Sequence, residues 1–252
     1  MQDEVYYAIP SYLRSDKQET VDYLRSVGIP KERIYVFVQT EDDYSKYKAA
    51  HGDKCEIIYR EADSVPKARN NILRFFKKEK NILMMDDDVS RFETGSKESR
   101  LEELESPDTV IASLFDITKR LHGQIFGLYP VDNNFFMKDS VCMKKPVNTV
   151  IGFPKGFPLL FDESYIAKED IELCGRIMDM GGSIVRFNNI TFKARHRTND
   201  GGCKDVWKSG VNAMYAKQLT MTYPDIYAVK GNNRQEIRTI VADRTKRIKP
   251  WK

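Results

Sequence analysis

The sequence predicts a single α/β domain in which helices flank a mixed, Rossmann-like central sheet. Strand-like and helix-like segments alternate at short intervals through residues 1–92, which is typical of parallel βαβ units. The segment Ile82–Met85 is continuously apolar, as expected of a strand buried on both faces of a parallel sheet. No G-x-G-x-x-G motif follows the first strand, so a dinucleotide-binding domain is not indicated.

Four strands and three helices are predicted in this first half. Pro10 ends the first strand because it cannot donate a ladder hydrogen bond, and Gly28 and Gly52 end the first two helices. The predicted strands are Val5–Ile9, Ile34–Val38, Glu56–Tyr59 and Ile82–Met85, and the predicted helices are Ser15–Val27, Asp42–His51 and Val65–Lys78.

The second half, residues 106–200, changes character. Glu93–Glu105, which precedes it, is highly charged and contains glycine, so we expect a mobile surface loop there. Helical periodicity marks Pro107–Leu121 and Ile166–Met180. Short extended segments are expected at Gln124–Tyr129, Phe135–Met137, Val150–Gly152, Ser183–Phe187 and Thr191–Ala194.

Residues 201–252 are predicted to form a helical, basic C-terminal extension. A helix is expected at Val206–Thr220, and Ile237, Ile240 and Val241 have the spacing of a second helix docked on the body with its basic face outward. The segment Arg234–Lys252 carries seven Lys and Arg against one Glu and one Asp. Such a segment either tracks a phosphate backbone or is simply solvated.

The bulk properties are those of a globular protein. The chain has 252 residues, 41% of them hydrophobic, and a net charge of +4. It has no apolar run near the roughly 20 residues of a membrane span and no signal-peptide pattern. Its four cysteines show no short C-x-x-C spacing. We therefore expect reduced thiols in a cytoplasmic protein without a membrane partner.

Three consecutive aspartates, Asp86, Asp87 and Asp88, directly follow the fourth strand. Open α/β sheets bind ligands at the carboxyl ends of their strands, and carboxylates crowded there repel one another unless a cation holds them together. Oxygen ligands on a short turn suit Mg²⁺ or Mn²⁺, especially when a diphosphate supplies further oxygens. The alternative is a polar turn in which one aspartate caps a helix.

Together with two further motifs, this turn resembles the GT-A class of glycosyltransferases. Asp86-Asp87-Asp88 is similar to the D-x-D turn that holds a divalent metal and the diphosphate of a nucleotide-sugar in that class. Ala68-Arg69-Asn70 is similar to the "ARN" helix start of family-2-type enzymes, and Glu169-Asp170 is similar to the "ED" pair that supplies the catalytic base. The resemblance implies the GT-A fold.

The motifs more closely resemble one branch, the TET-associated glycosyltransferases. The residues that carry this resemblance are Ile9–Arg14, Arg69-Asn70, the aspartate triplet and Ala194–Arg197. The branch is linked to sugar transfer onto hydroxymethylated pyrimidines in DNA, often in phages. DNA is then the expected acceptor, and the host cytoplasm is the expected compartment if the chain is phage-encoded.

The resemblance also implies the donor and metal residues. Asp88 would bind the metal, Asp86 the metal or the ribose, and His196 would be a further metal ligand; Asp87 is assigned to the donor site. Pro10, Tyr12 and Arg14 would hold the nucleoside, with Tyr12 stacking on the base, and Gln39 would read the uracil edge of a UDP-sugar. Two of these assignments have an ordinary alternative: His196 as a surface or helix-capping residue, and the turn at Pro10 as a turn that binds no ligand.

Arg69 and the acidic pair leave two interpretations each. Arg69 either bridges to the diphosphate or the acidic turn, or is an ordinary surface arginine. Asp170 is the expected general base, with Glu169 raising its pKa. The same two acids are also favoured in any first helical turn by the helix dipole.

Phe135 and Phe136 follow Asp132-Asn133-Asn134, a combination that could hold a flipped base. We expect them instead to be core residues after a polar turn.

The expected function is therefore metal-dependent transfer of a sugar, from a UDP-sugar, to hydroxymethylpyrimidine in DNA. The alternatives are the same chemistry on a polysaccharide, lipid or protein, or a non-catalytic DNA-binding module that retains the fold. A nucleotidyltransferase would normally carry a glycine-rich loop after the first strand, and Ile9–Arg14 contains no glycine.

Overall fold

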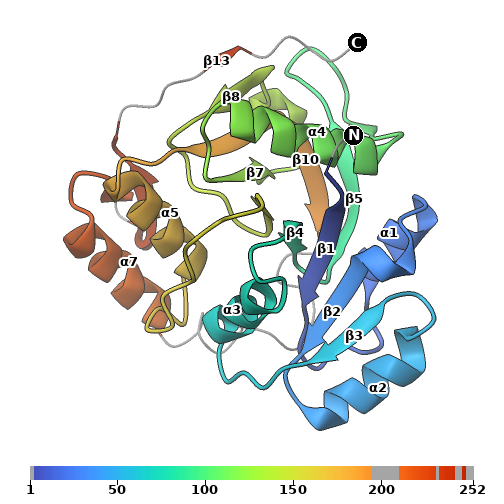
Figure 1. Ribbon diagram of the computed structural model, residues 1–252. Coiled ribbons are helices and arrows are strands. Elements are labelled where there is room, and N and C mark those ends of the chain that lie inside the picture. Colours follow the sequence, from blue (N-terminus) through green and yellow to red (C-terminus); the bar gives the residue numbers. More distant parts are fainter. Residues whose placement is uncertain (1–2, 195–209, 231–232, 242–245, 248–252) are drawn as a thin grey trace.

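The computed structural model describes residues 3–194, 210–230, 233–241 and 246–247 (Figure 1). Within them, an 11-stranded mixed sheet runs through the centre of the molecule in the order β13-β8-β10-β7-β9-β4-β1-β2-β3, with β5 and β6 attached through β10. A separate two-stranded sheet joins β11 and β12. The mixed sheet flanked by helices that the sequence predicts is confirmed.

The strands and helices follow one another as expected through the first half. The strands there are β1 (Val5–Pro10), β2 (Ile34–Val38), β3 (Glu56–Tyr59) and β4 (Asn81–Met85), and the helices are α1 (Glu19–Ser26), α2 (Glu41–His51) and α3 (Val65–Phe75), with a short 3-10 helix η1 (Lys31–Arg33). All four strands run parallel in the order β4-β1-β2-β3. Their carboxyl ends therefore lie at one edge of the sheet.

The second half adds antiparallel strands and brings further segments to the same sheet. Its elements are β5 (Val89–Thr94), β6 (Glu102–Glu103), α4 (Pro107–Arg120), β7 (Ile125–Tyr129), η2 (Asn134–Phe136), β8 (Ser140–Cys142), β9 (Val150–Phe153), α5 (Glu169–Asp179), β10 (Ile184–Ala194), α7 (Val211–Thr222), β11 (Tyr227–Lys230), β12 (Asn233–Thr239) and β13 (Lys246–Arg247). Strand β9 pairs antiparallel with both β4 and β7.

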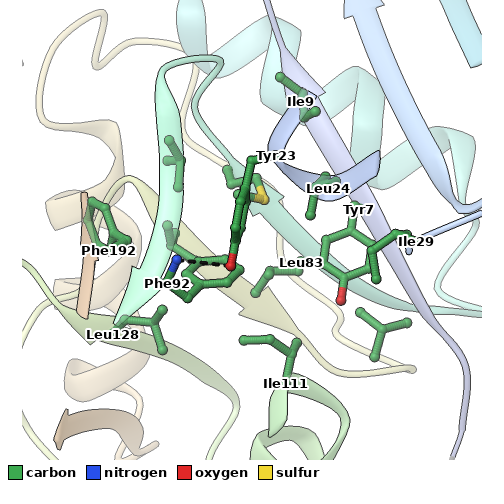
Figure 2. Packing of buried hydrophobic residues seen from close by; sticks show 14 of the residues in the cluster. Tyr7, Ile9, Tyr23, Leu24, Ile29, Leu83, Phe92, Ile111, Leu128 and Phe192 are labelled. Atoms are coloured by element: carbon green, nitrogen blue, oxygen red, sulfur yellow. Dashed lines mark hydrogen bonds between the residues drawn. The ribbon is translucent and has the colours of Figure 1, made fainter. Parts of the chain in front are cut away.

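Helices cover both faces of the sheet because successive residues of the central strands point to opposite faces. On β4, Leu83 joins one core cluster with residues of α1, α2 and α4, whereas Ile82 and Met84 join the other with residues of α3, α5 and α7. Figure 2 shows part of the first cluster, where the Tyr23 hydroxyl accepts a hydrogen bond from the Phe92 backbone. The continuous apolar run of β4 is thus explained by burial on both sides.

Two segments differ from the sequence-based expectation. The loop predicted at Glu93–Glu105 begins inside β5, where Phe92 is fully buried and Glu93 is only 5% exposed. Strand β5 pairs with β10, a partner about a hundred residues away that the local charge pattern does not reveal. The two strands predicted within residues 183–194 are one strand, β10, with an irregular register between Phe187 and Thr191.

The C-terminal segment and the phenylalanine pair also differ. Ile237 lies in strand β12, not in a helix, and packs together with Val241 against the second core cluster, while Ile240 is 47% exposed. Phe135 and Phe136 lie in the 3-10 helix η2, not in the extended segment expected at Phe135–Met137, and are 58% and 55% exposed. The expectation that they are core residues was wrong, because the preceding polar turn carries them outward.

Of the four cysteines, Cys55, Cys142 and Cys174 are buried free thiols, and Cys203 lies outside the described residues. No helix in the described part of the chain has both the length and the apolar character needed to cross a bilayer.

Candidate active site

The candidate site lies at the edge where the parallel strands end. Strand β1 leads into Ser11–Arg14, β2 into Gln39, and β4 into the aspartate triplet. The amino end of the antiparallel strand β9 reaches the same edge, since Met85 pairs with Val150. The sheet therefore brings together segments that are far apart in the sequence, from Ser11 to Val150.

The main chain of the aspartate turn is held on both sides. Asp86 N donates to Thr149 O at 3.2 Å, and Asp86 O accepts from the Thr20 hydroxyl at 2.7 Å. Thr20 N donates to Asp87 O, and Val89 N donates to the Thr20 hydroxyl. The first turn of α1 and the start of β9 thus fix the turn in place, which is the kind of support a preorganised site requires.

Asp87 points into the protein. It is 3% exposed, pairs with Arg14 Nη1 at 2.6 Å and accepts a short hydrogen bond from the Ser11 hydroxyl. Ser11 Oγ in turn lies 2.8 Å from Tyr47 Oη and accepts from Gln18 Nε2 at 2.9 Å. Asp87 and Arg14 thus bind each other and help to hold the turn, and their contact with the donor stays a prediction.

Arg69 lies at the centre of the acidic groups. Its side chain is buried, with Nη2 at 3.4 Å from Asp86 Oδ1 and Nε at 3.5 Å from Glu169 Oε1. The guanidinium also lies over the ring of Phe161, 5.6 Å from its centroid. Arg69 therefore bridges the aspartate turn after β4 and the first residue of α5, and the alternative of an ordinary surface arginine is wrong.

The acidic pair of α5 stands in two environments. Glu169 is 6% exposed and faces Arg69, whereas Asp170 is half-buried and accepts a hydrogen bond from the Ile171 backbone at 2.8 Å. Lys168 precedes them in the left-handed region, with φ +62°. Burial lowers the pKa of Lys168, an effect that the carboxylates of Asp170 and of Glu236 on β12 oppose.

Desolvation raises the pKa of three carboxyl groups at this site. It brings the pKa of Asp86 to about 7 against the opposing charge of Arg69, and Asp88 and Asp87 add to the rise. The pKa of Glu169 is also about 7, from burial first, with Arg69 opposing and Asp170 adding. Burial raises the pKa of Asp170 as well, again against Arg69. Of the first two, Glu169, with 8% of its side chain exposed, is better shielded from solvent than Asp86, with 40%.

Comparison with known protein families gives one decisive match. Residues 6–202 match the model of the TET-Associated Glycosyltransferase family. The chain belongs to this family. It is accordingly a glycosyltransferase enzyme, and the resemblance to this branch, carried by Ile9–Arg14, Arg69-Asn70, the aspartate triplet and Ala194–Arg197, is confirmed. No curated protein matches the sequence of this glycosyltransferase.

Solved structures confirm the GT-A fold of the glycosyltransferase. Glucosyl-3-phosphoglycerate synthase from Mycobacterium tuberculosis, crystallised with Mn²⁺, UDP and glucosyl-3-phosphoglycerate, is similar with a TM-score of 0.53 and 13% identity, over 96% of this chain and 90% of that one. Its complex with Mn²⁺, UDP-glucose and phosphoglyceric acid has a TM-score of 0.50 at 13% identity, over 96% and 89%. A mycobacterial protein has a TM-score of 0.51 at 11% identity, over 96% and 86%.

Two supporting groups of the glycosyltransferase were not assigned roles from its sequence. Asn70 completes the "ARN" motif and pairs with the Phe161 backbone in both directions: Nδ2 donates to Phe161 O at 3.0 Å, and Oδ1 accepts from Phe161 N at 2.7 Å. This contact anchors the loop that leads to Glu169. Thr20 and Ser11 support the aspartate turn. Ser11 lies in the motif Ile9–Arg14, whereas no pattern in the sequence points to Thr20.

The remaining donor residues lie where the parallel strands end. Pro10 is the last residue of β1, Tyr12 is 40% exposed, and Gln39 directly follows β2 and is half-buried. Their position at the carboxyl edge agrees with a nucleoside-binding role without testing it. His196 lies outside the described residues.

The candidate ligands for a metal in the described part of the chain are Asp86 and Asp88, which are both half-buried. No three His, Cys, Asp or Glu side chains in the described ranges are arranged to hold a metal by themselves. Mg²⁺ and similar ions are commonly held by one or two carboxylates together with substrate phosphates, so two aspartates suffice where a diphosphate completes the shell. The mutual repulsion that helps to raise the pKa of Asp86 is what a bound cation would relieve. These residues fit such an ion.

Proposed function

We propose that this glycosyltransferase transfers a sugar from a nucleotide-sugar, a uridine diphosphate sugar, to a hydroxyl group with the help of Mn²⁺ or Mg²⁺. The observation that supports it most is the Arg69 bridge, which joins the aspartate turn to the acidic start of α5 at the carboxyl edge of the sheet. A site that places donor-side and acceptor-side carboxylates around one arginine suits a reaction in which negative charge builds up on a leaving diphosphate.

In the donor half, Asp88 and Asp86 would hold the ion, with His196 as a proposed further ligand. When bound, the ion supplies positive charge that stabilises the departing diphosphate. Arg69 is suited to the same task because its guanidinium lies 3.4 Å from Asp86 and could also donate a hydrogen bond to a phosphate oxygen bound beside the turn. Pro10, Tyr12 and Gln39 would line the nucleoside, and the similar Mn²⁺ and UDP complexes of the mycobacterial synthase support the choice of uridine.

In the acceptor half, we assign the general base to Asp170 and a supporting role to Glu169. Glu169 faces Arg69, so the half-buried Asp170 is the member of the pair available to an acceptor. Its carboxylate would take the proton of the acceptor hydroxyl while the oxygen bonds to the anomeric carbon and the bond from that carbon to the diphosphate breaks. Attack opposite the leaving group would invert the anomeric centre.

For the acceptor, we propose 5-hydroxymethylpyrimidine in DNA, which the family's name supports. The rival acceptors are a hydroxyl group of a polysaccharide, a lipid or a protein. The described part of the chain offers no helix that could span a bilayer, which gives no support to a lipid acceptor.

A donor and acceptor panel tests the proposal. The purified chain is incubated with UDP-glucose and other nucleotide-sugars, with and without Mn²⁺, and with DNA containing hydroxymethylcytosine, hydroxymethyluracil or unmodified bases. We expect Mn²⁺-dependent release of UDP and a hexose mass on a hydroxymethylated nucleoside. Release of UDP without modification of the DNA would overturn the proposed DNA acceptor. The absence of turnover with every UDP-sugar would overturn the proposed donor.

A further inference from the structure

Three tyrosines from the segment 210–230 contact helix α5 and the loop before it. Tyr223 Oη donates to Glu172 Oε1 at 2.8 Å, and Tyr227 Oη donates to Ile171 O at 2.8 Å. Tyr215 Oη donates to Ser164 O at 2.9 Å. All three side chains are at least 92% buried, and they come from α7, its carboxyl end and β11. Because the family match ends at residue 202, none of the three belongs to the matched region.

The contacts form a connected network around the first turns of α5. Glu172, which receives the Tyr223 hydrogen bond, also pairs with Arg176 Nη2 at 3.1 Å, and Arg176 donates to Leu160 O at 2.6 Å. The network thus holds the helix, the loop before it and the C-terminal segment together. Figure 1 shows α5 and α7 side by side in this arrangement.

The two tyrosines nearest the helix approach its backbone closely. A Cβ atom at Gly175 would lie 2.7 Å from a ring carbon of Tyr227 and 2.9 Å from one of Tyr223. Real Cβ atoms do not come this near, so the rings fit only because residue 175 is glycine. Ile171 and Glu172 directly follow Glu169-Asp170, so the tyrosine hydroxyls bind the same helical turn that carries the acidic pair.

We propose that the C-terminal segment is a positioning element for the general base. Tyr223 and Tyr227 set the position and rotation of the first turn of α5, and through it the distance from the Asp170 carboxylate to the acceptor oxygen. This inference rests on the proposed role of Asp170. It makes Tyr223 and Tyr227 positioning residues, because neither lies at the reacting atoms.

The rival interpretation is that these tyrosines only stabilise the fold. Tyr223→Phe and Tyr227→Phe keep the rings and remove one hydroxyl each. The matched control is Tyr7→Phe, since Tyr7 is 1% exposed and its hydroxyl donates to Asp108 at 2.9 Å in the other core cluster. A purely structural role predicts that all three variants have a lower melting temperature than the wild type and an unchanged kcat.

The measurements are transfer from UDP-glucose to an oligonucleotide containing hydroxymethylcytosine in Mn²⁺, binding of UDP-glucose with Mn²⁺, and the melting temperature. We expect kcat to fall about 10-fold in Tyr223→Phe and Tyr227→Phe, because sub-ångström misplacement of a catalytic group is costly. UDP-glucose affinity should stay within about twofold, the pattern of a lost transition-state interaction. Equal kcat in all three variants, or equal losses of kcat and donor affinity, would overturn the proposal.

Hydrogen–deuterium exchange separates this inference from the proposed function. In Tyr227→Phe, amides within residues 161–175 should exchange faster than in the wild type, whereas Tyr7→Phe should leave them unchanged. This readout needs no substrate. If the wild type turns over no UDP-sugar while exchange rises as expected, the proposed donor fails and the positioning contact stands. Unchanged exchange in an active enzyme overturns the positioning contact alone.

Discussion

At the scale of single residues, the buried guanidinium of Arg69 lies among three carboxylates of the site. Arg69 contacts Asp86 and Glu169, and its charge also acts on Asp170. Burial raises the pKa values of Asp86 and Glu169 to about 7, and the charge of Arg69 offsets only part of this rise. The consequences can be tested residue by residue.

Replacing Asp88 with Ala should abolish Mn²⁺-dependent donor binding while the melting temperature stays close to that of the wild type. The side chain is half-buried at the end of a turn, so its loss opens no core cavity. Calorimetric titration of UDP with and without Mn²⁺ measures the effect. Full transfer activity in Asp88→Ala would show that Asp88 is not a metal ligand.

Asp170→Asn keeps the size of the side chain but removes the base. We expect kcat to fall roughly 10²–10⁴-fold with little change in donor affinity, the usual contribution of general-base catalysis. Steady-state kinetics and equilibrium binding give the two quantities separately. A variant that turns over normally but binds the donor poorly would make Asp170 a binding residue.

The raised pKa values of Asp86 and Glu169 predict a pH-dependent stability. Both groups ionise near pH 4 in the unfolded chain but near 7 in the folded one. Their contribution to the free energy of unfolding is therefore fully present below about pH 4 and is lost as pH rises through about 7.

Thermal unfolding across pH 4–9 (a range set by those pKa values) tests this sign. The double variant Asp86→Asn, Glu169→Gln should flatten the fall in melting temperature between the two pKa values. Mn²⁺ should raise the wild-type melting temperature more at pH 8 than at pH 6, because the ion binds the ionised carboxylates. A metal effect independent of pH would contradict the assignment of Asp86.

At the scale of elements, the aspartate turn depends on segments that come from other parts of the chain. The loop after β1 supplies Arg14 and Ser11 to Asp87, the first turn of α1 supplies Thr20, and the start of β9 supplies Thr149. The turn is thus supported from three sides, and the middle aspartate links it to the nucleoside side of the proposed donor site.

Asp87→Ala should lower the free energy of unfolding by about 3 kcal/mol, the lower end of the usual cost of breaking a buried ion pair, since Arg14 retains some exposure. Urea denaturation measures the loss. The control is Asp42→Ala, which removes an exposed carboxylate paired with Lys46 and should cost under about 1 kcal/mol. Equal losses in the two variants would show that the Asp87 contacts contribute little.

At the scale of the whole molecule, the central sheet brings together the residues of the proposed donor site. The C-terminal segment packs against α5, the helix that carries the proposed general base. The main chain of β13 pairs with β8, so the basic segment continues onto the edge of the central sheet. Charge neutralisation is therefore a better test of its role than deletion, because deletion would also remove a strand.

Changing Arg244, Lys246, Arg247 and Lys249 to Gln should raise the KM for a DNA acceptor and weaken its salt dependence. Each lost phosphate contact should reduce the slope of log affinity against log salt by about 0.7–0.9. Hydrolysis of UDP-glucose should be unchanged, and neutralising the exposed Lys46 and Lys48 on α2 should alter neither quantity. Parallel losses of hydrolysis and transfer would show that the segment acts through the fold.

The local pattern of the sequence was enough to predict the four strands and three α-helices up to Met85 and the family, although not the short 3-10 helix η1. The strands and helices up to Met85 have apolar spacings that reflect burial directly, and the aspartate turn follows β4 without a gap. The segments that carry the family resemblance are short and contiguous, so they can be read without knowing which parts of the chain meet.

Only the tertiary structure decided where the side chains point. Asp87 turns inward because Arg14 and Ser11, more than 70 residues earlier, meet it there, and Arg69 is buried because β4 and α5 bring two carboxylates to it. Strand β5 and the β11–β12 hairpin exist through pairing with distant strands or packing on α5, not through their own propensity. The direction of a side chain and the pairing of an edge strand depend on distant partners, and local sequence carries little information about them.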